Sequence, residues 1–415
     1  MQKVFFKTFG CRTNQFDTQI MISKLKDYEI SMDEKNADIV IVNSCTVTNG
    51  ADSSVRNYIS TMKRKNPSVK VILAGCGAHS KGEALFADKK VHGVMGHSEK
   101  EKINEILKQE QPFYQIGDLS HIDSTIVEEF VGKSRAFIKI QEGCDFRCSY
   151  CIIPAVRGDA RSHKESDIIE QVTRLAGNGF GEFILTGTNV GSYGQDQGSS
   201  MAQLLKKLSN VRGVRRIRIG SLEPIQIDDE FKELLTEPWM AKHLHIALQH
   251  TSDKMLELMN RRNRFESDIK LFQEIAEKGY ALGTDYIVGH PGEDEAAWTE
   301  AISRVKELPL THVHAFTYSK RDNTPSATMK PEVKGDIAKA RHKELTEIIK
   351  AKNYLFRREH TSNLEVLLES GKDGVYQGFD QYFNRISVTS DEDLSSNWVL
   401  LNDIEVSSEG NKASL

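Results

Sequence analysis

The stretch from residue 136 to residue 151 reads AFIKIQEGCDFRCSYC and places three cysteines directly after a short apolar run. The run 136–140 is typical of a buried strand, and Cys144, Cys148 and Cys151 follow it with the spacing C-x3-C-x2-C. Thiolates this close together can bind one metal centre from a single loop. A closed zinc site or an all-cysteine iron–sulfur cluster needs four ligands, so three cysteines favour a [4Fe–4S] cluster with one open iron. A zinc site completed by a distant histidine is the alternative.

Around this stretch, short apolar runs alternate with helical patterns. Six runs are predicted to be strands, namely residues 136–140, 182–185, 215–219, 243–247, 281–288 and 312–318. Six β/α units favour a partial TIM-like (β/α)6 barrel over a single small sheet. The cysteine loop follows the first of these strands, at the end of a barrel where catalytic residues gather. A charged helix is predicted at residues 334–358.

The N-terminal part predicts a second cysteine site. Apolar runs at residues 3–8, 37–42 and 69–74, with helical patterns at 15–28 and 51–65, indicate a βαβαβ unit and a parallel sheet. One cysteine lies just past each strand; these are Cys11, Cys45 and Cys76.

The carboxyl ends of parallel strands meet at one edge, so three loops would bring these three thiols to one crevice. Gly10 and Gly75 allow tight turns directly before two of the cysteines. A single cysteine after a strand is usually a small buried hydrophobe, but three in the same position predict a second three-cysteine cluster.

The C-terminal part has a different pattern. Residues 364–368, 374–379, 384–389 and 398–405 alternate apolar and polar positions, with Gly, Asp and Asn between them, which predicts a small β-barrel. The whole chain is therefore expected to be an α/β protein of three domains, at residues 1–115, 130–355 and 360–415.

Composition limits the function classes. The chain has 415 residues, a net charge of −4 and six cysteines. No apolar run reaches the roughly 18 residues of a membrane span, and no signal-peptide pattern opens the chain, so we expect a cytoplasmic protein without a membrane partner. There, six cysteines favour metal or redox chemistry over disulfides. The net charge does not indicate a nucleic-acid partner, but residues 361–415 carry −7 and residues 1–360 carry +3.

The cysteine motifs resemble those of a known family. Residues 137–158, FIKIQEGCDFRCSYCIIPAVRG, resemble the signature of the radical S-adenosylmethionine methylthiotransferases. TFGCRTNQFD at 8–17 and VNSCTVTN at 42–49 resemble the auxiliary-cluster domain of that family. The resemblance covers almost the whole chain in the order cluster domain, radical-SAM barrel and TRAM-like β module, and it implies two [4Fe–4S] clusters and S-adenosylmethionine as cofactors.

The resemblance also implies a mechanism. The open iron of the cluster at Cys144, Cys148 and Cys151 would chelate S-adenosylmethionine, whose reductive cleavage gives a radical that takes hydrogen from carbon 2 of an adenine. The cluster at Cys11, Cys45 and Cys76 would carry the methylated sulfur. Residues after successive barrel strands are expected to contact S-adenosylmethionine; these are Thr186, Gly187, Asn189, Ser221, Glu223 and Gln249, with residues 285–290 covering the end of the fifth strand. The alternative is that they form ordinary turns.

Within the family, the motifs around Cys11 and Cys45 are most similar to the MtaB type, which acts on threonylcarbamoyl-adenosine at position 37 of tRNA. Isopentenyl-adenosine of tRNA and an aspartate of a ribosomal protein are the alternative substrates. A non-catalytic iron–sulfur or zinc protein that binds RNA or carries electrons is an alternative of another class. The expected partners are the tRNA anticodon loop and an electron donor such as flavodoxin or ferredoxin, with the enzyme acting as a monomer.

Four arginines are candidates for tRNA contacts, namely Arg157, Arg161, Arg216 and Arg218. Arg216 and Arg218 share one face of a predicted strand and would meet phosphates if that face lined the barrel mouth. The alternative is that these arginines are only solvated. His243, His245, His312 and His314 alternate along two strands and are expected to be packing or edge residues rather than ligands.

Overall fold

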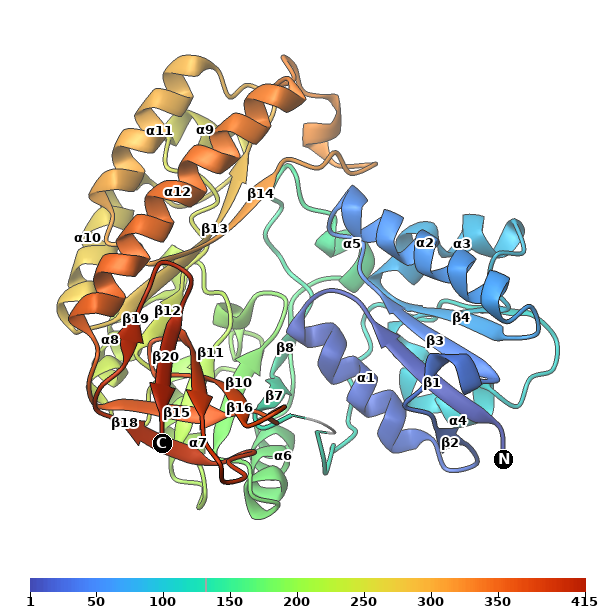
Figure 1. Cartoon of the computed structure of the whole chain (residues 1–415). Coiled ribbons are helices and arrows are strands. Elements are labelled where there is room, and N and C mark those ends of the chain that lie inside the picture. The colour runs from blue at the N-terminus through green and yellow to red at the C-terminus, as the bar shows by residue number, and fades with distance from the viewer. Residues whose placement is uncertain (131–132) are drawn as a thin grey trace.

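The computed structural model describes residues 1–130 and 133–415. It begins with an N-terminal α/β unit, a six-stranded parallel sheet flanked by helices (Figure 1). Its strands, in the order β2-β1-β3-β4-β5-β6, are β1 (Lys3–Thr8), β2 (Glu29–Ile30), β3 (Ile39–Ser44), β4 (Lys70–Gly75), β5 (Gly93–Met95) and β6 (Phe113–Gln115). Its helices are α1 (Arg12–Lys24), α2 (Asn49–Lys65), α3 (Cys76–Ala87) and α4 (Ile103–Ile106).

The three predicted N-terminal strands are present as β1, β3 and β4. Strands β2, β5 and β6 have only two or three residues each, too few for a periodic pattern to indicate them. Helix α1 begins three residues earlier than predicted, because the chain enters it directly from Cys11 at its N-cap.

The central strand β3 explains why this part of the sequence looks continuously apolar. Val40 and Val42 pack into one core with residues of α2, whereas Ile39 and Ile41 pack into a second core on the opposite face. A parallel sheet that is covered on both faces produces such runs. From β1 the chain passes to β2 on one side and then to β3 on the other, so the strand order reverses at β1 and β3. Crevices form outside the carboxyl ends of strands at such a point.

The middle of the chain forms an open barrel of six parallel strands. They are β7 (Ala136–Lys139), β10 (Glu182–Thr186), β11 (Arg216–Ile219), β12 (His243–His245), β13 (Ala281–Val288) and β14 (His312–Thr317), with a small hairpin of β8 (Gln141–Glu142) and β9 (Arg161–Ser162). The sheets β11-β10-β7 and β12-β13-β14 are joined by bridges between Leu222 and Ile246 and between Ile217 and Met240. No pairing within the described chain joins β7 to β14, so the predicted partial barrel is confirmed.

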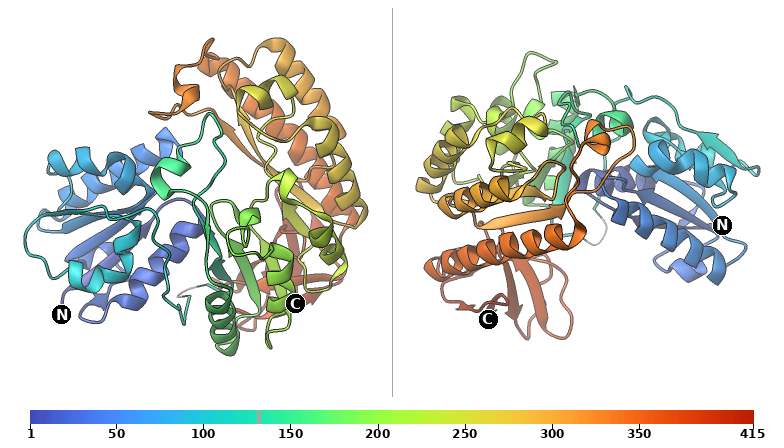
Figure 2. Two further views of the ribbon diagram at one scale, coloured as in Figure 1. Left: turned by 180° about the vertical axis from the view of Figure 1, so that it is seen from behind. Right: turned by 90° about the horizontal axis from the view of Figure 1, so that it is seen from above.

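Helices cover the outer face of the barrel, as Figures 1 and 2 show. They are α6 (Glu165–Gly177), α7 (Met201–Ser209), α8 (Asp229–Glu233), α9 (Asp253–Leu258), α10 (Phe265–Glu277), α11 (Glu295–Glu307) and α12 (Gly335–Glu359). The short helix α5 (Ile153–Arg157) lies instead between the barrel and the N-terminal unit, in contact with α3 (Figure 1). Among the helices of the described residues, none is both long and apolar enough to cross a membrane.

The N-terminal α/β unit bridges the two open edges of the barrel. On the β7 side, Asp17 of α1 accepts a hydrogen bond from Lys139 Nζ at 2.6 Å. On the β14 side, Asp52 of α2 accepts one from Arg321 Nη2, also at 2.6 Å. Figure 1 shows the carboxyl ends of β1, β3 and β4 directed toward the barrel. The loops that carry Cys11 and Cys45, after β1 and β3, therefore face the barrel opening.

The C-terminal residues form a curled six-stranded sheet, as the predicted small β module requires. Its order is β18-β15-β16-β17-β20-β19, and the strands are β15 (Leu364–Leu368), β16 (Val375–Phe379), β17 (Arg385–Thr389), β18 (Trp398–Leu401), β19 (Glu405–Val406) and β20 (Asn411–Ser414). The end of α12 packs on it, and Arg357 donates hydrogen bonds to Asn411 Oδ1 at 2.6 Å and to the Ser407 carbonyl at 2.9 Å.

Candidate functional site

Two adjoining cavities lie where the N-terminal α/β unit meets the barrel. The large cavity, of about 610 Å³, is lined by Cys11, Cys45 and Cys76. The small cavity, of about 300 Å³, is lined by Cys144, Cys148 and Cys151. The two cavities share wall residues, among them Thr188, Asn189, Glu223, Gln249 and Asp285. Both predicted cysteine triples therefore border one continuous site.

Close backbone packing forms the N-terminal triple. Cys11 is the N-cap of α1, Cys45 follows β3, and Cys76 begins α3. Gly10 has a φ of +92°, and a Cβ there would lie 2.6 Å from Cys45 Cβ and 2.9 Å from Cys45 Sγ. A residue other than glycine would therefore push the first two cysteine loops apart. The positive φ of Gly10 agrees with the predicted tight turn before a ligand, and the contact with Cys45 adds a second reason for a glycine here.

Arg157 contacts the most buried of these thiols. Cys76 is 3% exposed, and Arg157 Nε lies 3.1 Å from Cys76 Sγ. Burial raises the pKa of Cys76 to about 12, and the Arg157 guanidinium opposes that increase. A cation beside the thiol favours its thiolate form, which is the form that binds metal.

The barrel triple lies on the loop between β8 and α5. Asn189 Nδ2 lies 3.8 Å from Cys144 Sγ, and Arg261 Nη1 lies 3.8 Å from Cys148 Sγ. Burial raises the pKa of Cys151 to about 12 and also raises the pKa of Cys144. Side-chain donors thus contact two thiols of this triple.

The spacing of the thiols bears on the zinc alternative. A single zinc ion binds each thiolate sulfur at about 2.3 Å, so tetrahedral ligands lie within about 4 Å of one another. In the described chain, neither cysteine triple is among the groups whose ligand atoms all lie within 4.8 Å of one another. The donor set, three thiols with wider spacing at each site, fits an iron–sulfur cluster better than a single ion.

The six residues that were predicted to contact S-adenosylmethionine all line the large cavity, and Asn189, Glu223 and Gln249 also line the small one. Asn189 is 5% exposed, yet neither its Oδ1 nor the neighbouring Thr188 Oγ1 has a hydrogen-bond partner among the described residues. Buried acceptors without partners are uncommon in native proteins. These two oxygens fit the ammonium group of an amino-acid ligand that lies beside the barrel triple.

Glu223 lies in the wall between the two cavities. Arg261 Nη1 lies 2.8 Å from Glu223 Oε1 and orients the carboxylate. Gln249 has a φ of +65°, a rare conformation for a residue other than glycine. Backbone strain of this kind is concentrated at functional sites.

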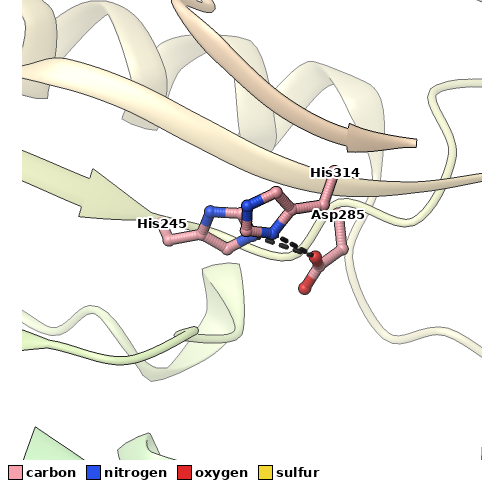
Figure 3. A group of neighbouring side chains, drawn as sticks. All are labelled: His245, Asp285 and His314. Atoms are coloured by element: carbon pink, nitrogen blue, oxygen red, sulfur yellow. Dashed lines mark ion pairs between the residues drawn. The ribbon is translucent and has the colours of Figure 1, made fainter. Parts of the chain in front are cut away.

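The histidines of the barrel strands were expected to be packing or edge residues rather than ligands, and the structure places them on the cavity wall. His243, His245, His312 and His314 all line the large cavity. Asp285 Oδ1 lies 3.1 Å from His245 Nε2 and 3.3 Å from His314 Nδ1, and Figure 3 shows both imidazoles directed at this carboxylate. Alternation along β12 and β14 was visible in the sequence, but it did not reveal which face lines the cavity.

Burial and neighbouring charges make Asp285 anionic and two of the histidines neutral. Burial would raise the pKa of Asp285, but His245 and His314 outweigh this effect and lower it, so the carboxylate is ionised. Burial lowers the pKa of His312 to about 4 and that of His243 well below its usual value, so both are neutral at pH 7. The cavity wall thus presents a fixed anion and two neutral imidazoles.

The four arginines that were predicted to contact tRNA are engaged inside the protein. Arg157 is 1% exposed, and Arg161 donates hydrogen bonds to three backbone carbonyls. Arg216 and Arg218 both pair with Glu182, at 2.6 Å and 2.8 Å. Their other donors reach backbone carbonyls of the C-terminal sheet. They attach this sheet to the barrel, so their prediction as phosphate contacts is wrong.

Arg157 belongs instead to a buried ion network between the N-terminal unit and the barrel. Its core contains the cations Lys100, Lys139 and Arg157 and the anions Asp17, Asp123 and Glu142. Asp17 lies at the centre, 2.6 Å from Lys139 Nζ, 2.8 Å from Lys100 Nζ and 3.0 Å from Arg157 Nη2. Three positive and three negative charges balance, so the network can fix the two cysteine triples relative to each other.

Comparisons with known proteins agree with this geometry. Residues 3–96 match the uncharacterized protein family UPF0004, and residues 138–305 match the radical SAM superfamily. A Helicobacter pylori (strain J99) protein, whose name provisionally assigns it as a methylthiotransferase, is 52% identical over the full length of both chains. The threonylcarbamoyladenosine tRNA methylthiotransferase MtaB of Aquifex aeolicus is 36% identical over 85% of this chain and 89% of its own.

Relatives that are named for the two other substrates also match, each at 32% identity: a tRNA-2-methylthio-N(6)-dimethylallyladenosine synthase of Hydrogenobaculum and a ribosomal protein uS12 methylthiotransferase of Acetivibrio thermocellus. Among solved structures, the radical S-adenosylmethionine methyltransferase TsrM of Kitasatospora setae has a similar fold, with a TM-score of 0.61 at 15% identity over 79% of this chain and 77% of that chain.

Proposed function

This chain belongs to the radical S-adenosylmethionine methylthiotransferases, and we propose that it adds a methylthio group to carbon 2 of threonylcarbamoyl-adenosine at position 37 of tRNA. The observation that carries the proposal is that two cysteine triples border adjoining cavities with a shared wall. A protein that only carried electrons or bound RNA would have no use for a substrate-sized space between its two centres. The MtaB relative and the motif around Cys11 support the choice of substrate.

In this proposal each triple holds one [4Fe–4S] cluster, with Cys144, Cys148 and Cys151 on the small cavity and Cys11, Cys45 and Cys76 on the large one. When bound, the clusters and S-adenosylmethionine supply the removal of hydrogen from carbon 2 and the sulfur that replaces it. An external one-electron donor such as flavodoxin or ferredoxin supplies the reducing electron.

The side chains of the shared wall would hold S-adenosylmethionine between the two triples. Thr188 Oγ1 and Asn189 Oδ1 are acceptors without partners in the described chain and are available to its ammonium group. Glu223, held by Arg261, is placed to accept a hydrogen bond from a ribose hydroxyl. The adenosine of the tRNA anticodon loop would enter the large cavity, where Ser221 and Gln249 form part of the wall.

Product analysis tests this proposal. The anaerobically reconstituted protein is given S-adenosylmethionine and dithionite with one of three substrates: tRNA carrying threonylcarbamoyl-adenosine, tRNA carrying isopentenyl-adenosine, or the ribosomal protein. Mass spectrometry should find the 2-methylthio product on the first substrate only. Methylthiolation of either other substrate in preference would contradict the substrate assignment. Absence of product on all three, with both clusters assembled, would contradict the activity.

A further inference from the structure

One arginine of the large cavity lacks a partner among the residues that the structure describes. Arg12 directly follows Cys11, begins α1 and lines the cavity. Its guanidinium lies 5.4 Å from the centre of the Phe383 ring. Arg218 of β11 lies 5.2 Å from the same ring, and the His243 ring centre lies 5.1 Å away. Residues from the N-terminal unit, the barrel and the C-terminal sheet therefore meet at this corner, which we call the Phe383 corner.

The other arginines near this corner have carboxylate partners, but Arg12 has none among residues 1–130 and 133–415. Arg216 and Arg218 pair with Glu182, and Arg135 pairs with Glu369 at 2.5 Å. Arg12, by contrast, forms neither an ion pair nor a side-chain hydrogen bond with any residue in the described part of the chain. An arginine guanidinium is charged at pH 7 whatever its surroundings. Arg12 is partly exposed on the cavity wall, where its guanidinium can pair with a bound anion.

The position of Arg12 narrows the choice of anion. Arg12 lines the large cavity only, whereas the small cavity beside Cys144, Cys148 and Cys151 is where an amino-acid carboxylate would chelate a cluster. An anionic group of a substrate that enters the large cavity would therefore meet Arg12. Of the two adenosine modifications, the threonylcarbamoyl group carries a carboxylate and the isopentenyl group carries no charge. A guanidinium can donate two parallel hydrogen bonds to a carboxylate.

We propose that Arg12 binds the carboxylate of the threonylcarbamoyl group and so makes the large cavity selective for an acidic modification over an apolar one. The inference rests on the proposed function and deepens it. Arg12 is a specificity residue in this account, since it contacts the substituent of the base rather than carbon 2. A backbone phosphate of the RNA is the other source of an anion, and the experiment separates the two.

The test changes both the carboxylate of the RNA and the arginine of the protein. Two anticodon stem-loop RNAs are prepared, one with threonylcarbamoyl-adenosine and one in which the threonine carboxylate is a carboxamide. Wild-type protein, Arg12→Gln and Arg12→Lys are compared for kcat/KM of methylthiolation and for RNA binding by fluorescence anisotropy. Arg56→Gln, at an exposed position of α2, is the control.

For wild type we expect the carboxylate RNA to be preferred by roughly 10- to 100-fold, the range for a hydrogen-bonded charged group. Arg12→Gln should remove this preference, so that both RNAs react and bind within about twofold of each other. Arg12→Lys should keep part of the preference because it keeps the charge, and Arg56→Gln should keep all of it.

Three results would overturn the inference. The first is a wild-type protein that treats both RNAs alike. The second is a preference that survives in Arg12→Gln while the reaction with each RNA is unchanged. The third is a preference that survives while both RNAs lose activity by the same factor, which would assign the contact to a phosphate.

If Arg12→Gln fails to assemble its clusters, which iron content would reveal, Arg12→Lys takes its place, and wild-type protein that treats both RNAs alike still overturns the inference. The proposed function and this inference can also fail separately. No product on the carboxylate RNA contradicts the function, whereas product without a dependence on the carboxylate contradicts only the role of Arg12.

Discussion

Single residues fix the N-terminal triple in two different ways. Gly10 lets the loop that carries Cys11 pass directly against Cys45, because a Cβ at Gly10 would lie 2.6 Å from that of Cys45. Arg157 reaches from the barrel to Cys76 and connects the same thiol to the buried ion network. The effect of Gly10 is steric and that of Arg157 is electrostatic. Each of them fixes the position of a cysteine sulfur atom.

Replacing Gly10 with alanine should remove the N-terminal cluster without affecting the barrel cluster. The new methyl group would displace Cys45 or Cys11, so we expect the loss of about four irons per chain after reconstitution. Gly179→Ala is the matched control, because Gly179 has nearly the same φ, +94°, but a Cβ there would meet no atom of the described chain within 4 Å. Equal iron content in Gly10→Ala and Gly179→Ala would show that the contact with Cys45 does not matter.

At the scale of elements, strands could be predicted better than the contacts between them. The carboxyl ends of β1, β3 and β4 followed from apolar runs of about six residues, and the parallel sheet placed their cysteines at one edge. The polar residues after β10, β11 and β12 were located by the same argument. Strands of two or three residues gave no pattern, so β2, β5 and β6 were missed.

The meeting of side chains from different parts of the chain could not be predicted. Arg12 and Phe383 are more than 300 residues apart, and only packing of the C-terminal sheet brings them together. Arg216 and Arg218 looked like phosphate contacts because a lone strand does not show what covers its face. Glu182, one strand away, forms an ion pair with each of them. The one available signal for Arg12 was its position directly after a predicted ligand.

Substituting Glu182 tests how the C-terminal sheet is attached. Glu182→Gln would leave Arg216 and Arg218 buried without their shared carboxylate, and removing one partner of such a group costs about 3–5 kcal/mol. We expect a lower thermal midpoint and faster proteolysis between α12 and β15. Glu365→Gln, which removes only the exposed partner of Arg215, should change the midpoint little. Similar midpoints for the two variants would contradict this account of the attachment.

At the scale of the whole molecule, some acidic residues of the C-terminal sheet form ion pairs with arginines of the barrel. Glu365 pairs with Arg215 at 3.0 Å, and Glu369 pairs with Arg135 at 2.5 Å. Arg215 also lies 4.3 Å from the Trp398 ring centre. The negative charge of this sheet is thus complementary to the arginines of the barrel that it covers. The site itself lies between the N-terminal unit and the barrel, where the buried ion network holds them together.

The buried histidines should make the protein sensitive to mild acid. Burial lowers the pKa of His163 and His290 from the usual 6.5 to about 4, so in the folded chain they stay neutral between these two pH values. Between these pH values the unfolded chain binds more protons than the folded chain. Each decrease of one pH unit therefore lowers the free energy of unfolding by up to about 1.4 kcal/mol for each of these histidines. The free energy of unfolding should therefore be highest above pH 6.5 and decrease toward pH 4. A value that stays constant from pH 7 to pH 5 would contradict these pKa directions.

The central claim is that the adenosine substrate enters the space between two cysteine-bound clusters with its carbon 2 exposed to radical chemistry. Deuterium transfer tests it most directly. An anticodon stem-loop RNA carrying threonylcarbamoyl-adenosine with deuterium at carbon 2 is incubated with the reconstituted protein, S-adenosylmethionine and a reductant. The account predicts one deuterium in the 5′-deoxyadenosine that forms, together with a methylthio product that has lost it. Deuterium that stays in the RNA while 5′-deoxyadenosine accumulates would contradict it.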